Sequence, residues 1–144
     1  TKQFFPEIQL KPGRGMVLLT KPIQDLKVKG AFQYKEGYYY FRNIDNRILL
    51  GGGRELDFET ETTAEFGSNP TIKQNLIRHL NDFILPDHKH TLEMEWSGIM
   101  AFGKNKTPLI KKEGDHIALG VRLGGMGIAI GSKIGQTTAR LLFD

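Results

Sequence analysis

Residues 116–131 read HIALGVRLGGMGIAIG, and a helical pattern follows them as far as Leu142. The apolar run at residues 116–120 is typical of a short strand, so Gly124, Gly125 and Gly127 lie between a strand and a helix. Clustered glycines at such a place leave backbone N–H groups open at a helix N-terminus, where the helix dipole favours negative charge. The sequence therefore predicts a site for an oxyanion or an electron-rich heterocycle.

Short apolar or alternating segments elsewhere predict strands over residues 14–20, 31–34, 37–43, 47–50, 92–96, 109–110 and 117–120. Asn69 is placed to cap a helix whose first residue is Pro70, and apolar residues recur at helical spacing until Pro86 stops it. Most strands are neighbours joined by short turns, with one long helix mid-chain and a C-terminal helix after the glycine-rich loop. We therefore expect one α+β domain over residues 1–144, with a mainly antiparallel or mixed sheet.

Composition narrows the classes of function. The net charge is +4, from 20 Lys and Arg against 16 Asp and Glu, and the charges are interspersed, which disfavours nucleic-acid binding. The longest apolar runs, such as residues 16–19, are too short to span a membrane. The chain has no cysteine, which excludes disulfides, thiolate metal sites and a cysteine nucleophile. No charged and apolar leader opens it, so we expect a cytoplasmic protein.

The glycine run allows two interpretations. It does not match the dinucleotide fingerprint, because Gly125 and Gly127 are followed by Gly131 rather than by a glycine three positions on. A Walker-type phosphate loop is absent as well, since no Gly-Lys-Ser/Thr follows. Glycines also permit tight packing of a helix on a strand, so either ligand contact or close packing explains this run.

Aromatic residues supply further candidates. Tyr38 and Tyr40 share one face of a predicted strand and Tyr39 takes the other, so they serve either as core or as a phenol hydroxyl directed at a ligand. Trp96 ends a strand just before Gly98, which fits either core packing or a neighbouring planar ligand.

The sequence gives little support for a metal site or for the active site of a hydrolase. His88 and His90 could ligate a metal, but no third ligand falls at recognisable spacing, so we expect solvated loop histidines and no metal site. No Ser/His/Asp triad or pair of carboxylates with the pattern of a hydrolase can be placed.

Taken in order, these segments resemble the C-terminal half of FAD-dependent oxidoreductases of the D-amino-acid oxidase and glycine oxidase type. The similar stretches are the strand at residues 12–18, the aromatic hairpin at 37–52, the Trp-x-Gly segment at 96–100, and the glycine loop with its helix at 124–142. That family consists of bilobal flavoproteins whose N-terminal Rossmann lobe holds the ADP half of FAD. The resemblance implies that this chain is a fragment, the C-terminal substrate and flavin-covering portion of a larger protein, without the Rossmann lobe.

The resemblance also assigns residues to the cofactor. It places the backbone around Gly124, Gly125, Met126, Gly127 and Ile128 against the pyrimidine edge of the flavin. A helix N-terminus at that edge stabilises the negative charge that reduced flavin carries there.

Two residues are assigned to the substrate in the same way. Tyr40 takes the place of a substrate-facing tyrosine, and Met100 takes the place of an arginine that holds the substrate carboxylate in many amino-acid oxidases. A thioether cannot bind a carboxylate, so Met100 suits a less polar or N-substituted amine. Arg42, Arg54 or Arg122 would be the alternative carboxylate ligands, although each also fits a surface or structural charge.

The function implied by the resemblance is oxidation of a C–N bond of an amine or amino-acid-like substrate, by hydride transfer to FAD. The expected partners are that small molecule and the missing N-terminal FAD-binding lobe, without which the fragment is expected to be inactive. Either oxygen or an electron carrier would accept the electrons. The alternative is a non-catalytic α+β domain that binds a ligand or another protein.

Overall fold

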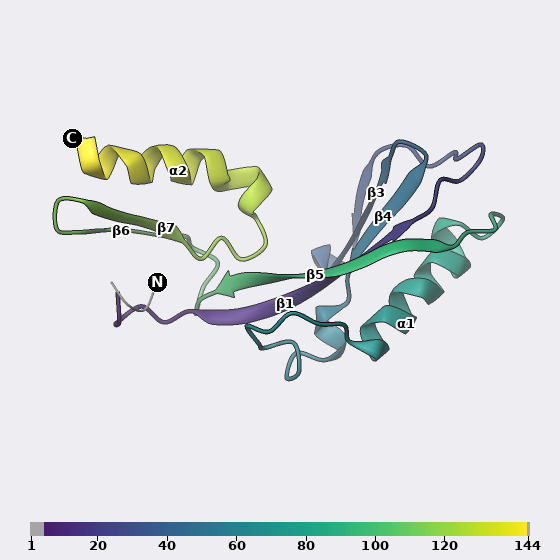
Figure 1. Ribbon diagram of the computed structural model, residues 1–144, viewed down its shortest axis with the longest axis horizontal. Helices are drawn as coiled ribbons and strands as arrows, with labels where there is room; N and C mark the ends of the chain where they lie inside the picture. The colour runs from purple at the N-terminus through teal and green to yellow at the C-terminus, as the bar shows by residue number, and fades with distance from the viewer. Residues whose placement is uncertain (1–4, 144) are drawn as a thin grey trace. The chain divides into compact units, whose positions relative to one another are not determined.

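The computed structural model describes residues 5–143 and has the α+β fold expected from the sequence (Figure 1). The chain divides into two compact units. Arg14–Ile99 form the larger one, called here the sheet unit, while Thr1–Gly13 together with Met100–Asp144 form the hairpin-helix unit.

A five-stranded sheet is the centre of the sheet unit. Its strands stand in the order β2-β3-β4-β1-β5, and the β2–β3, β3–β4 and β1–β4 pairs are antiparallel (Figure 1). The strands are β1 (Lys11–Thr20), β2 (Ala31–Tyr34), β3 (Tyr39–Ile44), β4 (Arg47–Gly52) and β5 (Leu92–Phe102). The short 3-10 turn η1 (Lys35–Gly37) joins β2 to β3, so the predicted hairpin is confirmed.

Helix α1 (Pro70–His79) begins where the sequence predicts. The Asn69 side-chain oxygen accepts hydrogen bonds from the backbone N–H groups of Thr71 and Ile72, at 3.1 and 3.3 Å. The helix continues as a π-helical segment, η3 (Leu80–Ile84), in which the Leu85 N–H bonds to the Leu80 carbonyl at 2.8 Å. This wider turn buries Leu80, Ile84 and Leu85 together, just before the proline that was expected to stop the helix.

The hydrophobic core lies between α1 and one face of the sheet. Leu18 and Leu50 are paired across β1 and β4, and both are fully buried. The core consists of Met16, Leu18, Ile23, Leu26, Tyr39, Ile48, Leu50, Ile72, Leu76, Leu80, Ile84 and Leu85. Burying each large apolar side chain contributes about 1.5–3 kcal/mol, so this cluster is the main source of stability in the sheet unit.

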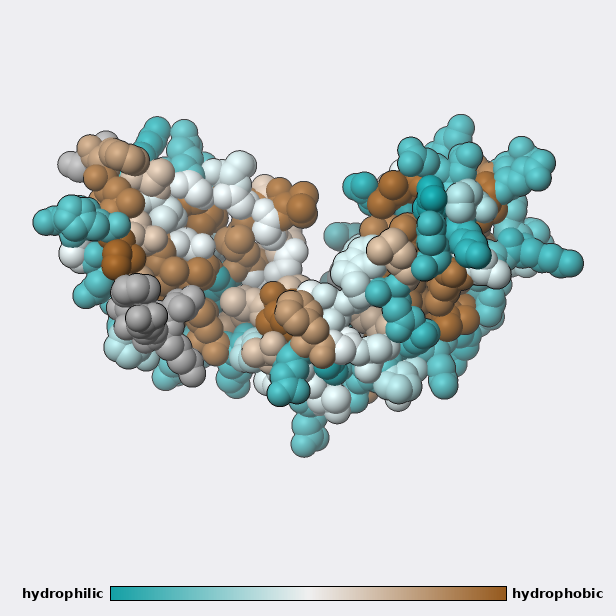
Figure 2. Space-filling view, viewed as in Figure 1, coloured by the Kyte–Doolittle hydropathy of each residue, from teal (hydrophilic) through white to brown (hydrophobic). Residues whose placement is uncertain are grey.

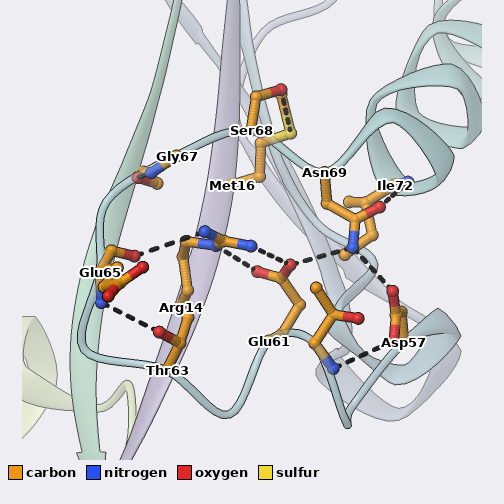
Figure 3. Close-up of polar contacts among 12 residues, drawn as sticks. Arg14, Met16, Asp57, Glu61, Thr63, Glu65, Gly67, Ser68, Asn69 and Ile72 are labelled. Carbon is orange, nitrogen blue, oxygen red and sulfur yellow. Dashed lines mark hydrogen bonds and ion pairs between the residues drawn. The ribbon is translucent and has the colours of Figure 1, made fainter.

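A buried ion pair fixes the connection between β4 and α1, which includes the 3-10 turn η2 (Arg54–Leu56). The Arg14 guanidinium on β1 donates to both carboxylate oxygens of Glu61, at 2.9 and 2.8 Å (Figure 3). Asn69 donates to Glu61 at 3.0 Å and to Asp57 at 2.9 Å, and so links the helix cap to the ion pair. Burial alone raises the pKa of Glu61, but the hydrogen bonds from Arg14 and Asn69 outweigh it and the net pKa is lowered.

The hairpin-helix unit contains the second sheet, β6 (Leu109–Glu113) paired antiparallel with β7 (Ile117–Val121), and the C-terminal helix α2 (Gly127–Phe143) packed on it. Ile130, Ile134 and Leu141, the helix positions expected to face inward, are half-buried. A Cβ atom at Gly120 of β7 would lie 3.0 Å from Ile134 and would clash with Thr138, so this glycine allows α2 to approach the strand. None of the helices in residues 5–143 is both long enough and apolar enough to cross a membrane.

Candidate functional site

The glycine-rich loop lies between β7 and α2, as the sequence predicts, and it forms the N-terminus of the helix. The Met126 carbonyl accepts hydrogen bonds from Ala129 and Ile130 at 3.0 and 3.1 Å, which begins the helical pattern. The Met126 N–H bonds to the Leu123 carbonyl at 2.8 Å, and the Gly124 N–H bonds to Ala101 on β5 at 3.2 Å. The loop is therefore held by its own backbone and by the end of β5.

Three backbone donors in this loop remain open. Within residues 5–143, the N–H groups of Gly125, Gly127 and Ile128 donate to no acceptor. The first N–H groups of any helix have no partner inside the helix, and here no side chain caps them. Together with the positive end of the helix dipole, these donors favour a ligand that carries negative charge or hydrogen-bond acceptors.

Close packing does not explain the loop glycines. A Cβ atom at Gly124, Gly125 or Gly127 would meet its nearest neighbour at 3.8, 3.5 and 3.6 Å, which is ordinary van der Waals contact. Gly124 and Gly125 instead have φ angles of 55° and 87°, which side-chain-bearing residues rarely adopt. The packing interpretation therefore applies to Gly120 and not to this loop.

The loop is bordered by apolar side chains that are exposed to solvent. Met126 is 55% exposed and Ile128 is 103% exposed, and brown apolar surface is visible over the start of α2 (Figure 2). The sulfur of Met100 lies 3.5 Å from the position that a Cβ atom on Gly125 would take, so Met100 lies beside the glycine loop. An apolar rim around open backbone donors suits a flat, largely apolar ligand with one polar edge.

Tyr40, the other residue assigned to the substrate, belongs to the sheet unit. It lies on the sheet face opposite α1 and pairs in register with Gly51, where a Cβ atom would clash with the Tyr40 hydroxyl. Burial raises the pKa of this phenol. Tyr39, in contrast, is fully buried on the α1 side, so the predicted alternation of the tyrosines is confirmed.

A shallow pocket of about 260 Å³ lies on the α1 side of the sheet unit, and it includes the tryptophan that the sequence singled out. Its wall is formed by Met16, Gly67, Ser68, Glu95, Trp96 and Ser97. Trp96 is 41% exposed, so it is a surface residue of this unit rather than core. Glu95 pairs with Lys73 of α1 at 2.5 Å, which compensates its charge within the pocket.

Two of the three arginines considered for carboxylate binding make contacts elsewhere. Arg122 donates to the Thr107 carbonyl at 2.9 Å and crosses closely over Gly103. Arg54 lies 5.0 Å from the centre of the Phe58 ring. Arg42, on β3, is exposed.

One buried polar contact in the sheet unit was not predicted from the sequence. The Tyr34 hydroxyl and the His79 Nδ1 atom lie 2.8 Å apart, although the residues are 45 positions apart in the chain. Burial, together with the positive charges of Lys35 and Arg78, lowers the pKa of His79. No three His, Asp or Glu side chains among the described residues lie close enough together to hold a metal ion.

Comparisons with known proteins identify the group to which this fold belongs. A family model described as DAO, FAD dependent oxidoreductase, matches residues 1–141. No curated protein matches the chain. Among solved structures, that of L-proline dehydrogenase from P. horikoshii is similar, with a TM-score of 0.74 and 17% identity over 94% of this chain. The chain covers 36% of that relative's length.

Proposed function

Because the chain belongs to the DAO family of FAD-dependent oxidoreductases, we propose that its parent protein oxidises a C–N bond of an amine or amino-acid-like substrate. The family's cofactor is FAD. Since this chain spans about a third of the length of its structural relative, we assign the Rossmann lobe that binds the ADP half of FAD to a part of the parent outside these residues.

The open backbone donors of the glycine loop carry this proposal. Gly125, Gly127 and Ile128 offer N–H groups without an acceptor among the described residues, and Met100 and Met126 supply an apolar border. A flavin ring is flat and apolar across its faces, and it has carbonyl and nitrogen acceptors along its pyrimidine edge. The residues present therefore fit this cofactor.

The chain's own groups would contribute orientation and charge stabilisation. Bound FAD would supply the hydride acceptor for oxidation of the substrate C–H bond next to nitrogen. The N–H groups of Gly125, Gly127 and Ile128 would hold the pyrimidine edge, and the α2 dipole would stabilise negative charge there. Because these donors are fixed by the fold before the reaction, little reorganisation is needed when the charge develops.

We propose Tyr40 of the sheet unit and Met100 of the hairpin-helix unit, each considered by itself, as candidate substrate contacts. The Tyr40 hydroxyl, held over Gly51, can donate a hydrogen bond to a polar group of the substrate. The Met100 side chain supplies apolar contact beside the glycine loop and no charge. These roles favour an amine carbon skeleton packed against the thioether.

The test is anaerobic reduction of the full-length parent protein. We expect the desalted protein to show a visible flavin band that bleaches when an amine or amino acid is added without oxygen. Release of peroxide on readmitting air would identify an oxidase, and its absence a dehydrogenase with another acceptor. A folded parent that is colourless and gains no band with added FAD would contradict the proposal and leave a non-catalytic binding domain.

A further inference from the structure

Positive charge is concentrated in the hairpin-helix unit. Residues 100–112 and 116–143 contain seven Lys and Arg residues and no Asp or Glu. In the sheet unit, by contrast, the numbers of acidic and basic residues are nearly equal. The net positive charge of the chain therefore comes from the unit that also contains the glycine loop.

Two of these cations lie in the connection between β5 and β6, residues 103–108, called here the lysine loop. Lys104 and Lys106 are exposed, and neither forms an ion pair with any group in residues 5–143. The Asn105 side chain between them accepts a hydrogen bond from the Thr107 N–H at 3.2 Å. The Arg122 guanidinium donates to the Thr107 carbonyl at 2.9 Å. Two fixed contacts thus shape the loop, and Arg122 adds a third positive charge to it.

The β6–β7 hairpin separates these cations from its own acidic residues. Leu109 pairs with Val121 beside the lysine loop, and Glu113 pairs with Ile117 at the other end of the hairpin. Glu113 and Asp115 therefore lie about 13 Å away along the strands, at the usual rise per residue. At that distance in water, most of their effect on the lysine loop is screened at physiological ionic strength. The loop end of the hairpin is positive and the turn end is not.

The lysine loop adjoins the glycine loop. The Ala101 carbonyl at the end of β5 accepts a hydrogen bond from the Gly124 N–H at 3.2 Å, and Lys104 follows Ala101 by three residues. Arg122 is two residues before Gly124. The exposed cations therefore lie next to the loop that the proposed function gives to the flavin. A molecule bound at the lysine loop would be close to the cofactor.

We propose that the lysine loop binds an acidic, one-electron redox protein that accepts the electrons of the oxidation. This inference rests on the proposed function and names the class of its electron acceptor. Oxidation of an amine to an imine releases two electrons and two protons, so two acceptor molecules are reduced by one electron each and the protons pass to water. Opposite charges speed the encounter of two proteins more than they prolong it, which suits a partner that must leave after each transfer.

A membrane rich in anionic lipid would also attract lysines, but the number of cations favours a protein. Basic segments that hold a protein on such a membrane contain about 4–8 Lys or Arg residues. The lysine loop offers three with Arg122, and the adjoining helix α2 has only Lys133 and Arg140 along its length. A small charged surface of this kind is typical of the transient contacts between redox proteins.

The experiment uses the full-length flavoprotein, reduced photochemically without oxygen so that no amine is needed. Its reoxidation is followed with plastocyanin, an acidic copper protein, and with cytochrome c, a basic haem protein, at ionic strengths of about 0.01 and 0.3 M. The test variant is Lys104→Glu/Lys106→Glu. The matched control is Lys27→Glu/Lys29→Glu, which reverses two exposed lysines at the same spacing in the sheet unit. Fluorescence anisotropy of labelled plastocyanin measures binding to the oxidised protein directly.

We expect opposite salt dependences for the two acceptors. The rate constant with plastocyanin should fall about 10-fold or more between the low and the high ionic strength, because screening removes the attraction. Lys104→Glu/Lys106→Glu should lower the plastocyanin rate at low salt about 10-fold and weaken binding of the labelled protein, and it should raise the rate with cytochrome c. Lys27→Glu/Lys29→Glu should change neither acceptor by a comparable factor. Both variants should keep the flavin band.

The same salt dependence with both acceptors, or equal effects of the two double variants, would overturn the docking site. Loss of FAD from Lys104→Glu/Lys106→Glu would assign these lysines to the cofactor instead. Binding to phosphatidylserine vesicles that depends on Lys104 and Lys106, without a preference between the two redox proteins, would assign the loop to a membrane. A bound flavin that no amine reduces would overturn the proposed function alone, because the acceptor test uses no amine.

Discussion

The core of the sheet unit and the C-terminal helix α2 of the hairpin-helix unit bury their apolar residues to very different extents. In the sheet unit, Leu18, Ile48 and Leu50 are completely buried beneath α1. In the hairpin-helix unit, no residue of α2 is fully buried, and Ile128 at the start of the helix is completely exposed. The sheet unit therefore owes its stability to its own core, whereas the start of α2 presents surface that is suited to a ligand.

The polar groups of the two units differ as well, because some are paired and others are open. Inside the sheet unit, the buried charges of Arg14 and Glu61 compensate each other, and Asn69 donates a further hydrogen bond to Glu61. At the glycine loop, backbone donors of Gly125 and Gly127 are left open among the described residues. Compensated polar groups specify a fold, and open donors beside apolar surface are typical of a binding site.

The largest expected effect comes from the buried ion pair. Glu61→Gln removes the carboxylate and leaves the Arg14 charge buried, so we expect a loss of about 3–5 kcal/mol in the free energy of unfolding. This loss is measured as a shift in the midpoint of chemical denaturation of the full-length protein. Glu93→Gln, which breaks the exposed pair with Arg47, is the control and should leave the midpoint almost unchanged. Equal effects of the two substitutions would show that the Arg14–Glu61 pair is not a special source of stability.

A substitution in each unit tests the difference in burial directly. Leu76→Ala removes a fully buried core side chain, and we expect about 2–5 kcal/mol of destabilisation. Ile128→Ala removes an apolar side chain of similar size that is 103% exposed, so the free energy of unfolding without flavin should not change measurably. Thermal unfolding of both variants in the apo protein gives the comparison. A large loss from Ile128→Ala would mean that protein, rather than cofactor, covers this side chain.

Removal of the N-terminal cap of α1 should lower the free energy of unfolding by a smaller amount. Asn69→Ala removes the acceptor for the Thr71 and Ile72 amides and also the donor to Glu61, and we expect a loss of about 1–2 kcal/mol. Asn69→Asp keeps the cap but places a second carboxylate beside Glu61, so it should recover only part of the stability. Urea denaturation distinguishes the two variants. Full recovery with aspartate would indicate that the contact with Glu61 contributes little.

The smallest expected effect is a pH dependence from His79. Its pKa in the folded protein lies below the ordinary 6.5, so near that pH the unfolded chain binds more protons than the folded one. Stability should therefore fall as the pH drops below about 6.5, until the folded pKa is also passed. Unfolding midpoints between about pH 7.5 and 5.5 measure this slope, and His79→Gln should flatten it. An unchanged slope in the variant would assign the effect to other groups.

Much of the fold follows from local signals in the sequence. Asn69 before Pro70, the tyrosine alternation in β3 and the glycines before α2 each depend on a few adjacent residues, and each is confirmed. The Arg14–Glu61 pair joins residues 47 positions apart and leaves no periodic pattern, so it could not be predicted. The same holds for the approach of Met100 to Gly125, which depends on where β5 ends.

Only part of the candidate site could be predicted from the sequence, because contacts between residues far apart in the chain leave no local pattern. The glycine loop is one continuous segment, and its position at a helix N-terminus follows from spacing. Gly120 permits close packing of α2, whereas Gly125 has no such role. This difference depends on the contacts that each position makes with other elements, so the sequence does not show it.

We propose that the start of α2 binds the flavin. Gly127 and Gly131 are both helical glycines without crowded neighbours, so valine at either position should fold comparably. The measurement is the flavin-to-protein absorbance ratio of the desalted full-length protein, with Gly127→Val compared against Gly131→Val. We predict that Gly127→Val loses much of its flavin because a side chain blocks the open amides, and that Gly131→Val retains it. Equal retention of flavin by the two variants would show that the open amides at the start of α2 do not bind it.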